Sequence, residues 1–248
     1  MAKISKTNTA NLVAAVPKAN VALVTGGSRG IGRAIALRLA KLGYSIVICG
    51  RDESALEESR KQIEQSGARV LSIALDVTNS TKVPDAVHKI EKEFGPIQVL
   101  VNNAGVGGFG PVQEKTEADW DRVLDTNLKS VFLMSRAIIP CMIQRGSGDI
   151  INISSLAGHN AFAGGGIYCA SKWGLRGLSA CMAEDLREHG IRVSVVSPGS
   201  VATEFSGRGP KDPSKTLAAE DVAHAVATIV TQNPQSFVSE IQIRPLRK

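Results

Sequence analysis

The sequence of 248 residues predicts one α/β domain, in which helices cover both faces of a parallel sheet. Three observations support this fold class. Short apolar segments typical of buried strands alternate along the chain with amphipathic segments of helical period. No linker, internal repeat or low-complexity block divides the sequence. The hydrophobic fraction of 43% suits a substantial core, and α/β chains of this length routinely form one domain.

The expected strands are short and rich in Val, Ile and Leu, as in parallel sheets that are buried on both faces. They lie at 20–24, 45–49, 69–75, 97–102, 149–154, 191–197 and 237–243. The expected helices lie between them, at 31–42, 53–66, 80–94, 117–145, 165–189 and 219–232. Pro140 lies inside the fourth of these helices, where we expect it to kink the helix or mark a bend.

The first strand leads into a glycine-rich turn, residues 25–32, and then into a helix. Glycines let the chain turn tightly and let backbone N–H groups approach a diphosphate, while the helix N-terminus adds favourable partial charge. The spacing Gly26-x-x-x-Gly30-x-Gly32 differs from the commonest Gly-x-Gly-x-x-Gly pattern, and a lone glycine turn is often only a turn. In this context it predicts a dinucleotide site in a doubly wound Rossmann domain. The sheet order would then be 3-2-1-4-5-6, with the seventh strand added at the edge.

Tyr168 and Lys172 stand four residues apart in the expected helix 165–189. Residues at i and i+4 lie one above the other on a helix face, so an ammonium group would lie beside a phenol. A neighbouring positive charge lowers the pKa of a phenol from its usual value of about 10. Such a phenol can exchange a proton with a carbonyl or alcohol oxygen. Taken alone, the pair also fits a packed Tyr and a Lys that reaches solvent.

Together these features resemble the short-chain dehydrogenase/reductase family in its compact single-domain form, including members similar to 3-oxoacyl-carrier-protein reductases. The resemblance spans about residues 20–245, and Ser155 precedes Tyr168 by the thirteen residues that separate the catalytic Ser and Tyr of that family. Its other motifs are Asp76-Val77, Asn102-Asn103-Ala104-Gly105, Asn127, Ser154-Ser155 and Pro198-Gly199.

The resemblance implies a catalytic set of Asn127, Ser155, Tyr168 and Lys172. Tyr168 would be the general acid in carbonyl reduction and the general base in alcohol oxidation. Lys172 would lower the pKa of Tyr168 and bind the nicotinamide ribose. Ser155 would donate a hydrogen bond to the carbonyl oxygen as negative charge develops there. Asn127 would hold a water that relays protons, the alternative being a buried, hydrogen-bonded Asn at a helix irregularity.

The resemblance also implies a set of residues that bind the cofactor. Asp76 would contact the adenine, Asn103 would be partly a structural peg beside it, and Thr203 would bind the nicotinamide amide. The full set is Gly26, Ser28, Arg29, Gly30, Ile31, Gly32, Arg51, Asp76, Val77, Asn103, Ala104, Gly105, Tyr168, Lys172, Pro198, Gly199, Val201 and Thr203. Residues expected to border the substrate are Phe109, His159, Asn160 and Phe162.

Two arginines favour the phosphorylated nicotinamide cofactor. In this fold a carboxylate about 20 residues after the glycine turn favours NAD, whereas an Arg accommodates the 2′-phosphate of NADP. Arg51 and Asp52 both follow the second strand, and spacing alone does not choose between them. Because Arg51 comes first and Arg29 could meet the same phosphate, we predict NADP(H) as the cofactor. The alternative is that Arg51 and Asp52 pair at the surface.

Composition excludes several other classes of protein. The net charge is +6, but no basic block accompanies it and aromatic residues make up only 4%, so no nucleic-acid partner is expected. The four Cys and four His have no ligand spacing, so no metal is expected. No apolar run approaches the length of a membrane span or a secretory signal, so we expect a cytoplasmic protein without a membrane partner. Residues 1–19 are expected to form a flexible tail before the domain 20–248.

The leading hypothesis is an NADP-dependent oxidoreductase that transfers a hydride between NADPH and a small-molecule carbonyl or alcohol. One alternative is a 3-oxoacyl-carrier-protein (acyl thioester) reductase, since Arg208, Lys211 and Lys215 in an expected lid, about 200–218, could meet an acidic carrier. Against it, the C-terminal segment lacks the Asn-Gly-Gly ending usual in those enzymes. The other alternative is a catalytically idle NADP-binding sensor or scaffold. We expect a homotetramer or homodimer that pairs through the helices 117–145 and 165–189 and the last strand.

Overall fold

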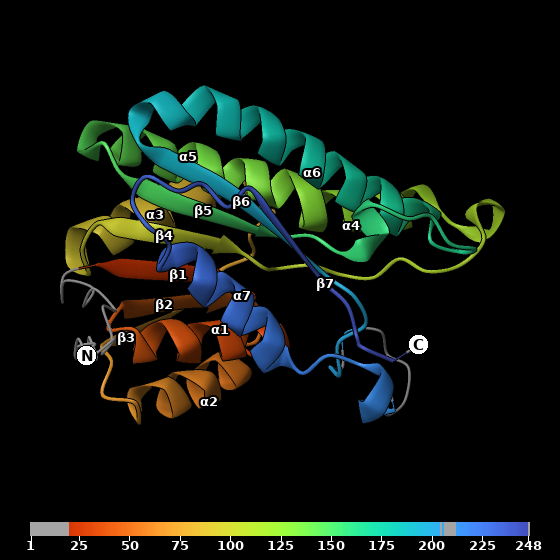
Figure 1. The fold of residues 1–248 in the computed structure, drawn as a ribbon, viewed down its shortest axis with the longest axis horizontal. Coiled ribbons are helices and arrows are strands. Elements are labelled where there is room, and N and C mark those ends of the chain that lie inside the picture. Colours follow the sequence, from red (N-terminus) through yellow and green to blue (C-terminus); the bar gives the residue numbers. More distant parts are fainter. Residues whose placement is uncertain (1–19, 204, 206–211, 248) are drawn as a thin grey trace, which may run out of the picture.

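The computed structural model describes residues 20–203, 205 and 212–247. Seven parallel strands form one sheet in the order β3-β2-β1-β4-β5-β6-β7, with helices on both faces (Figure 1). The predicted fold class and strand order are therefore confirmed. The expected tail 1–19 lies outside the described residues, as do positions 204 and 206–211 of the expected lid.

Each expected strand and helix is present, with ends that differ by a few residues. The strands are β1 (Val21–Thr25), β2 (Ser45–Gly50), β3 (Val70–Ala74), β4 (Ile97–Asn102), β5 (Gly148–Ile153), β6 (Ile191–Pro198) and β7 (Glu240–Ile243). The α-helices are α1 (Gly30–Lys41), α2 (Glu53–Glu64), α3 (Lys82–Glu93), α4 (Glu117–Leu124), α5 (Ser130–Arg145), α6 (Gly166–Leu186) and α7 (Ala219–Val230).

Two hydrophobic cores flank the sheet because successive side chains of a strand point to opposite faces. From β1, Ala22 and Val24 pack with residues of α1, α2 and α7. Val21 and Leu23 pack on the other face with residues of α3, α5 and α6. Strands covered on both sides must be apolar throughout, which is why the short apolar runs identify them in the sequence.

The expected helix 117–145 is divided in the structure. A single π-helical turn, Asp125–Lys129, separates α4 from α5. Helix α5 runs through Pro140 without ending there, so the expected interruption lies about three and a half turns earlier, around Asn127. Pro140 is exposed, so water can bond the carbonyl group that loses its N–H partner. Single π turns are frequent at functional sites.

The strand order reverses at β1, which has β2 on one side and β4 on the other. In an open parallel sheet this reversal leaves a crevice outside the carboxyl ends of the strands, where ligands bind. Among the described helices, none combines the length and apolar composition that crossing a bilayer would require.

Candidate active site

A cleft of about 1540 Å³ lies beyond the carboxyl ends of the strands. The glycine turn lines one end of it, and Ser155, Tyr168 and Lys172 line the other. Every residue that the sequence analysis assigned to the cofactor lines this cleft. Asn127 is buried behind the wall, next to the lining residue Thr126.

The glycine turn is shaped to bring backbone N–H groups to the cleft. Gly26 has a φ of 65°, and a Cβ built on Gly32 would lie 2.2 Å from the carbonyl oxygen of Gly26, so this approach requires glycine. Helix α1 then begins with no side-chain cap and no acidic residue in its first turn. Its first N–H groups, at Gly30 and Ile31, are at the cleft wall. An uncapped helix N-terminus of this kind fits a phosphate-bearing ligand.

Polar side chains of neighbouring elements hold the turn in place. Asn103 donates from Nδ2 to the carbonyl oxygens of Thr25 (2.9 Å) and Gly26 (3.2 Å), so it is a peg as expected. Thr25 Oγ1 accepts from the N–H groups of Asn103 and Ala104, both at 3.0 Å. Ser59 on α2 donates to a third carbonyl of the turn at 2.8 Å. Sequence reasoning missed Thr25 and Ser59, because each acts through a partner distant in the chain.

Arg51 and Asp52 have different surroundings. Asp52 accepts from the N–H of Ala55 at 3.0 Å and caps α2. Asp76 accepts from the N–H and hydroxyl groups of Thr78, at 2.9 and 2.7 Å. Burial acts to raise the pKa of Asp76, but these hydrogen bonds and the charge of Arg51 hold it below its usual value. Arg51 thus supplies positive charge at this end of the cleft, while Asp52 has a structural partner on its own helix.

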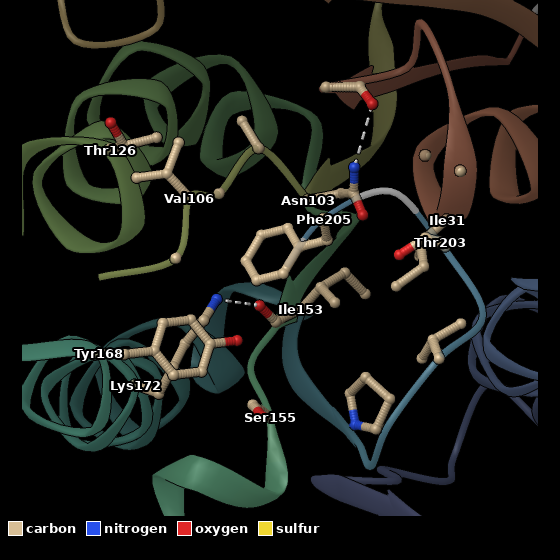
Figure 2. Close-up of a pocket in the computed structure, with 18 of the residues that line it drawn as sticks. Ile31, Asn103, Val106, Thr126, Ile153, Ser155, Tyr168, Lys172, Thr203 and Phe205 are labelled. Atoms are coloured by element: carbon tan, nitrogen blue, oxygen red, sulfur yellow. Dashed lines mark hydrogen bonds between the residues drawn. The ribbon is translucent and has the colours of Figure 1, made fainter. Parts of the chain in front are cut away.

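Tyr168 and Lys172 extend from α6 into the far end of the cleft, with Ser155 just beyond the end of β5 (Figure 2). Tyr168 is 8% exposed and Lys172 4%. The Lys172 Nζ donates to the carbonyl oxygen of Ile153 at 2.9 Å and lies 5.8 Å from the centroid of the Tyr168 ring. The ammonium group of Lys172 is therefore near the phenol of Tyr168, but its hydrogen bond is to the backbone of β5.

Burial dominates the pKa values of this pair. It raises the pKa of Tyr168 to about 12, against a hydrogen bond from Ser155 that acts to lower it. It lowers the pKa of Lys172 to about 8. Lys172 is not among the groups that shift the pKa of Tyr168 in this structure, so the lowering expected from Lys172 stays a prediction. The ammonium group bonds to Ile153, and Ser155 is the group that favours the phenolate.

Asn127 is 1% exposed and its side chain is bonded on both sides. Its Oδ1 accepts from the N–H of Val106 at 2.8 Å, and its Nδ2 donates to the Val106 carbonyl and to Ser171 Oγ, both at 3.0 Å. This geometry matches the alternative of a buried Asn at a helix irregularity. Both N–H donors of the side chain are used, so the amide has none left for a water.

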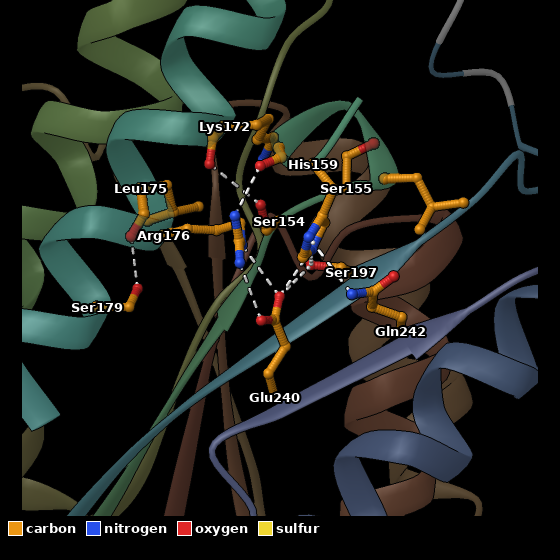
Figure 3. Close-up of polar contacts among 12 residues, drawn as sticks. Ser154, Ser155, His159, Lys172, Leu175, Arg176, Ser179, Ser197, Glu240 and Gln242 are labelled. Atoms are coloured by element: carbon orange, nitrogen blue, oxygen red, sulfur yellow. Dashed lines mark hydrogen bonds and ion pairs between the residues drawn. The ribbon is translucent and has the colours of Figure 1, made fainter. Parts of the chain in front are cut away.

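A polar network below the cleft joins α6, the segment after Ser155 and the last strand; Figure 3 shows it. Arg176 on α6 donates to both carboxylate oxygens of Glu240 on β7, each at 3.1 Å, and to the carbonyl oxygen of Gly158 at 2.9 Å. His159 Nε2 lies 2.8 Å from Glu240 Oε1 and 3.1 Å from Ser197 Oγ. Burial acts to raise the pKa of Glu240, but Arg176 and its other partners hold it below its usual value.

This network corrects one expectation and adds two residues. His159 turns toward β7 and is not part of the cleft lining, so its expected place beside the substrate is wrong. The other expected substrate neighbours, Phe109, Asn160 and Phe162, do line the cleft. Sequence reasoning missed Arg176 and Glu240, because 64 positions separate them and neither lies in a recognisable motif.

Comparisons with known proteins agree on one family. The family model described as short chain dehydrogenase matches residues 20–214. A metagenomic short-chain oxidoreductase solved in complex with NADP has a TM-score of 0.83 and 44% identity, covering 93% of this chain and 98% of its own. An alcohol dehydrogenase from the archaeon Thermococcus sibiricus, complexed with 5-hydroxy-NADP, has a TM-score of 0.87 and 29% identity, covering 92% and 97%. The gluconate 5-dehydrogenase of Gluconobacter oxydans is 38% identical over 75% of this chain and 73% of its own length.

Proposed function

The chain belongs to the short-chain dehydrogenase family, and from this premise we propose that it is an NADP-dependent enzyme that interconverts a carbonyl compound and its alcohol. One observation carries the proposal. The buried phenol of Tyr168 lines the same cleft as Ser155 and as an uncapped helix N-terminus in a glycine turn. Proton-transfer chemistry and an anion-binding site therefore share one cavity.

The lining residues fit a nicotinamide dinucleotide. The N-terminus of α1 would bind the diphosphate, Arg29 and Arg51 the 2′-phosphate, and Lys172 the nicotinamide ribose. Asp76 would contact the adenine of the cofactor, and Thr203 would bind its nicotinamide amide. The NADP and 5-hydroxy-NADP bound to the two related structures support the phosphorylated form. When bound, this cofactor would supply the hydride that reduces the substrate carbonyl carbon.

Tyr168 would deliver the proton in the direction of reduction. With a pKa raised to about 12, its phenol stays protonated at neutral pH and is ready to donate to a carbonyl oxygen. Ser155 would donate a hydrogen bond to the same oxygen as negative charge develops on it. The Lys172 ammonium, 5.8 Å from the ring centroid, would stabilise the phenolate that remains. Low exposure of both residues keeps water from competing for these groups.

Asn127, in the π turn, would help to return a proton to Tyr168 after the reaction. Because both N–H donors of its side chain are bonded to protein groups, a relay water would have to bind a carbonyl oxygen there. A π turn shifts backbone carbonyl groups out of the regular α-helical pattern, which frees such an acceptor. We therefore propose that Asn127 fixes the turn and that its backbone serves the relay.

The narrower acyl-thioester function has less support. It depends on basic residues of the expected lid, of which Arg208 and Lys211 lie outside the described residues and Lys215 is exposed. We therefore propose the broader carbonyl reductase activity. The idle sensor or scaffold is disfavoured because the cleft gathers Ser155, Tyr168 and Lys172.

A panel of substrates tests the proposal. Purified protein and NADPH are mixed with ketones, oxoacyl thioesters and keto-sugars, and the loss of NADPH absorbance is followed. Turnover of at least one carbonyl class is expected. NADPH binding without turnover of any class would favour the scaffold, and absence of NADPH binding would contradict the proposal altogether.

A further inference from the structure

Aromatic residues are concentrated at the Tyr168 end of the cleft. The chain has only six Phe, two Tyr and two Trp, yet Phe109, Phe162 and Phe205 all line this cleft with Tyr168. They come from three segments, which follow β4, β5 and β6 respectively. A chain with 4% aromatic residues has little chance of gathering half of its phenylalanines in one cavity. We call these three residues the phenylalanine cluster.

The rings of the cluster have the geometry of interacting aromatic groups. The ring centroid of Phe109 lies 5.2 Å from that of Tyr168 and 6.2 Å from that of Phe162. The ring centroid of Phe205, in the segment that follows β6, lies 6.0 Å from that of Tyr168 (Figure 2). All three pairs are tilted, an arrangement that aromatic pairs prefer within about 4.5–7 Å.

Glycines make room for two of these rings. A Cβ built on Gly107 would lie 2.7 Å from the Phe109 ring, and one built on Gly165 would lie 2.6 Å from the Phe162 ring. A side chain at either glycine position would displace the ring from its present place. Phe162 and Phe205 still keep 48% and 45% of their surface exposed, so they are not part of the protein core. An apolar ligand in the cleft would cover surface that water now contacts.

The described lining offers no carboxylate beside the cluster to accept from the hydroxyl groups of a polyhydroxylated substrate, although polar side chains such as Lys115 and Asn160 line the cleft there. Among the described lining residues the carboxylates are Asp52 and Asp76, which belong to the glycine-turn end. Arg122 is already bonded to the Gly107 carbonyl at 3.1 Å. Each hydroxyl of a sugar acid would need a partner in the site, because buried polar groups without one are costly. An aromatic ring next to the carbonyl needs none.

We propose that the phenylalanine cluster binds the aromatic ring of an aryl ketone or aryl aldehyde while Tyr168 meets its carbonyl oxygen. This inference rests on the proposed carbonyl reductase function and names its substrate class. In the reaction the C=O π bond breaks. The carbon gains a hydride with its electron pair, the oxygen gains the Tyr168 proton, and NADPH is oxidised to NADP⁺. The product is an aryl carbinol.

Two ketones of similar shape test the proposal. Acetophenone and cyclohexyl methyl ketone differ in whether the ring is aromatic, and both are compared with a keto-gluconate. Aromatic pairing contributes about 0.5–1.5 kcal/mol beyond burial, so its loss should lower the ratio of kcat/KM for acetophenone to that for cyclohexyl methyl ketone by about 2- to 12-fold, a comparison in which the different reactivities of the two carbonyls cancel. Phe109→Leu and Phe162→Leu should each reduce this ratio. Phe237→Leu, which replaces an exposed Phe outside the cleft lining, should leave the ratio unchanged.

Binding without turnover gives a second measurement. Calorimetric titration of Tyr168→Phe with 1-phenylethanol and 1-cyclohexylethanol should show the same preference for the aromatic ring. Equal affinity for the two alcohols, a higher kcat/KM for the keto-gluconate, or Phe variants that slow both ketones equally would overturn the inference. These results would leave the carbonyl reductase function intact, because turnover would still be seen. No turnover of any ketone, together with no binding of NADPH, would overturn that function as well.

Discussion

The ammonium group of Lys172 donates a hydrogen bond to the carbonyl oxygen of Ile153, at 2.9 Å. This bond fixes α6, which carries Tyr168, to the end of β5, two residues before Ser155. The position of the charge is thus set by the sheet, although Lys172 and Tyr168 share one helix face. The arrangement places a buried cation where the proposed chemistry uses it, and the protein carries the cost of that burial.

The first prediction concerns the stability cost of Lys172. Burial lowers its pKa from 10.5 to about 8, so between these pH values the unfolded chain binds more protons than the folded one. Lys172 should therefore contribute a rise in the free energy of unfolding with pH across this window, and the cost of the buried charge is fully present below it. In Lys172→Met this rise should disappear. Denaturant titrations of the parent and the variant at several pH values from 7 to about 10 measure it as a difference, in which the opposing contributions of the buried Cys49 and Tyr168, present in both proteins, cancel.

The exposed Lys41 provides the control for this prediction, because Lys41→Met removes a lysine that is not buried. The pH dependence of that variant should match the parent protein. Parallel pH profiles for the parent and Lys172→Met would show that burial of Lys172 carries no such cost.

The second prediction concerns Glu240 as a positioning residue. Glu240→Gln keeps the size of the side chain but removes the charge that pairs with Arg176 and His159. Hydrogen bonds to charged groups contribute about 1.5–3 kcal/mol, and partial exposure of this pair places the expected loss of stability near or below the lower end. Because the network holds the segment after Ser155, kcat should fall while the Kd for NADPH changes little.

Glu184→Gln is the matched control. Glu184 lies near the end of α6, the helix that carries Arg176, and pairs with Arg187 at 3.4 Å on the protein surface. Surface pairs contribute about 0–1 kcal/mol, so stability and kcat should both stay close to the parent values. If Glu240→Gln lost stability but kept the parent kcat, Glu240 would be structural only.

The third prediction concerns the choice of cofactor. Arg51 should make NADPH bind about ten- to a hundredfold more tightly than NADH, and Arg51→Ala should remove most of that difference. Asp52→Ala should leave the preference unchanged and cost about 1 kcal/mol of stability, because Asp52 caps α2. Fluorescence titration of both cofactors measures these values. Equal affinities in the parent protein, or tighter NADH binding, would transfer the role to Asp52.

The fourth prediction is that the protein forms a homodimer or homotetramer through its long helices. Phe132 on α5 and Trp173 on α6 are both exposed, and so is Trp120 on α4. Light scattering at micromolar concentration should give at least a dimer mass, and Phe132→Glu or Trp173→Glu should lower it. A monomer mass for the parent protein would refute the prediction.

The strands and helices were predictable from sequence patterns that repeat over a few residues. Buried strands and amphipathic helices repeat every few residues, so each element was predictable from its own segment, to within a few residues at its ends. For β7 the predicted last residue, 243, agrees with the structure, whereas the predicted first residue, 237, is three residues before the observed start at Glu240. The π turn was foreseen only as an alternative, a helix irregularity at Asn127, because one inserted residue leaves the apolar period within each flanking helix unchanged.

Long-range pairs account for what sequence reasoning missed in the site. The Lys172–Ile153 and Arg176–Glu240 contacts join residues of different elements, and no local pattern links the two partners of either contact. His159 lies near Ser155 in the chain, but its partners on β6 and β7 turn its ring away from the cleft. Burial sets the pKa values of Tyr168 and Lys172, and burial depends on the complete fold.

The central claim is that Tyr168 is the proton donor, and Tyr168→Phe tests it most directly because only the hydroxyl group is removed. NADPH consumption with a good ketone substrate is measured for the parent and the variant, with NADPH binding and thermal stability measured alongside. We predict that turnover falls by at least about a hundredfold, in line with loss of a general acid, while binding and folding persist. A variant that reduced the ketone at close to the parent rate would contradict the assignment of Tyr168 as the acid.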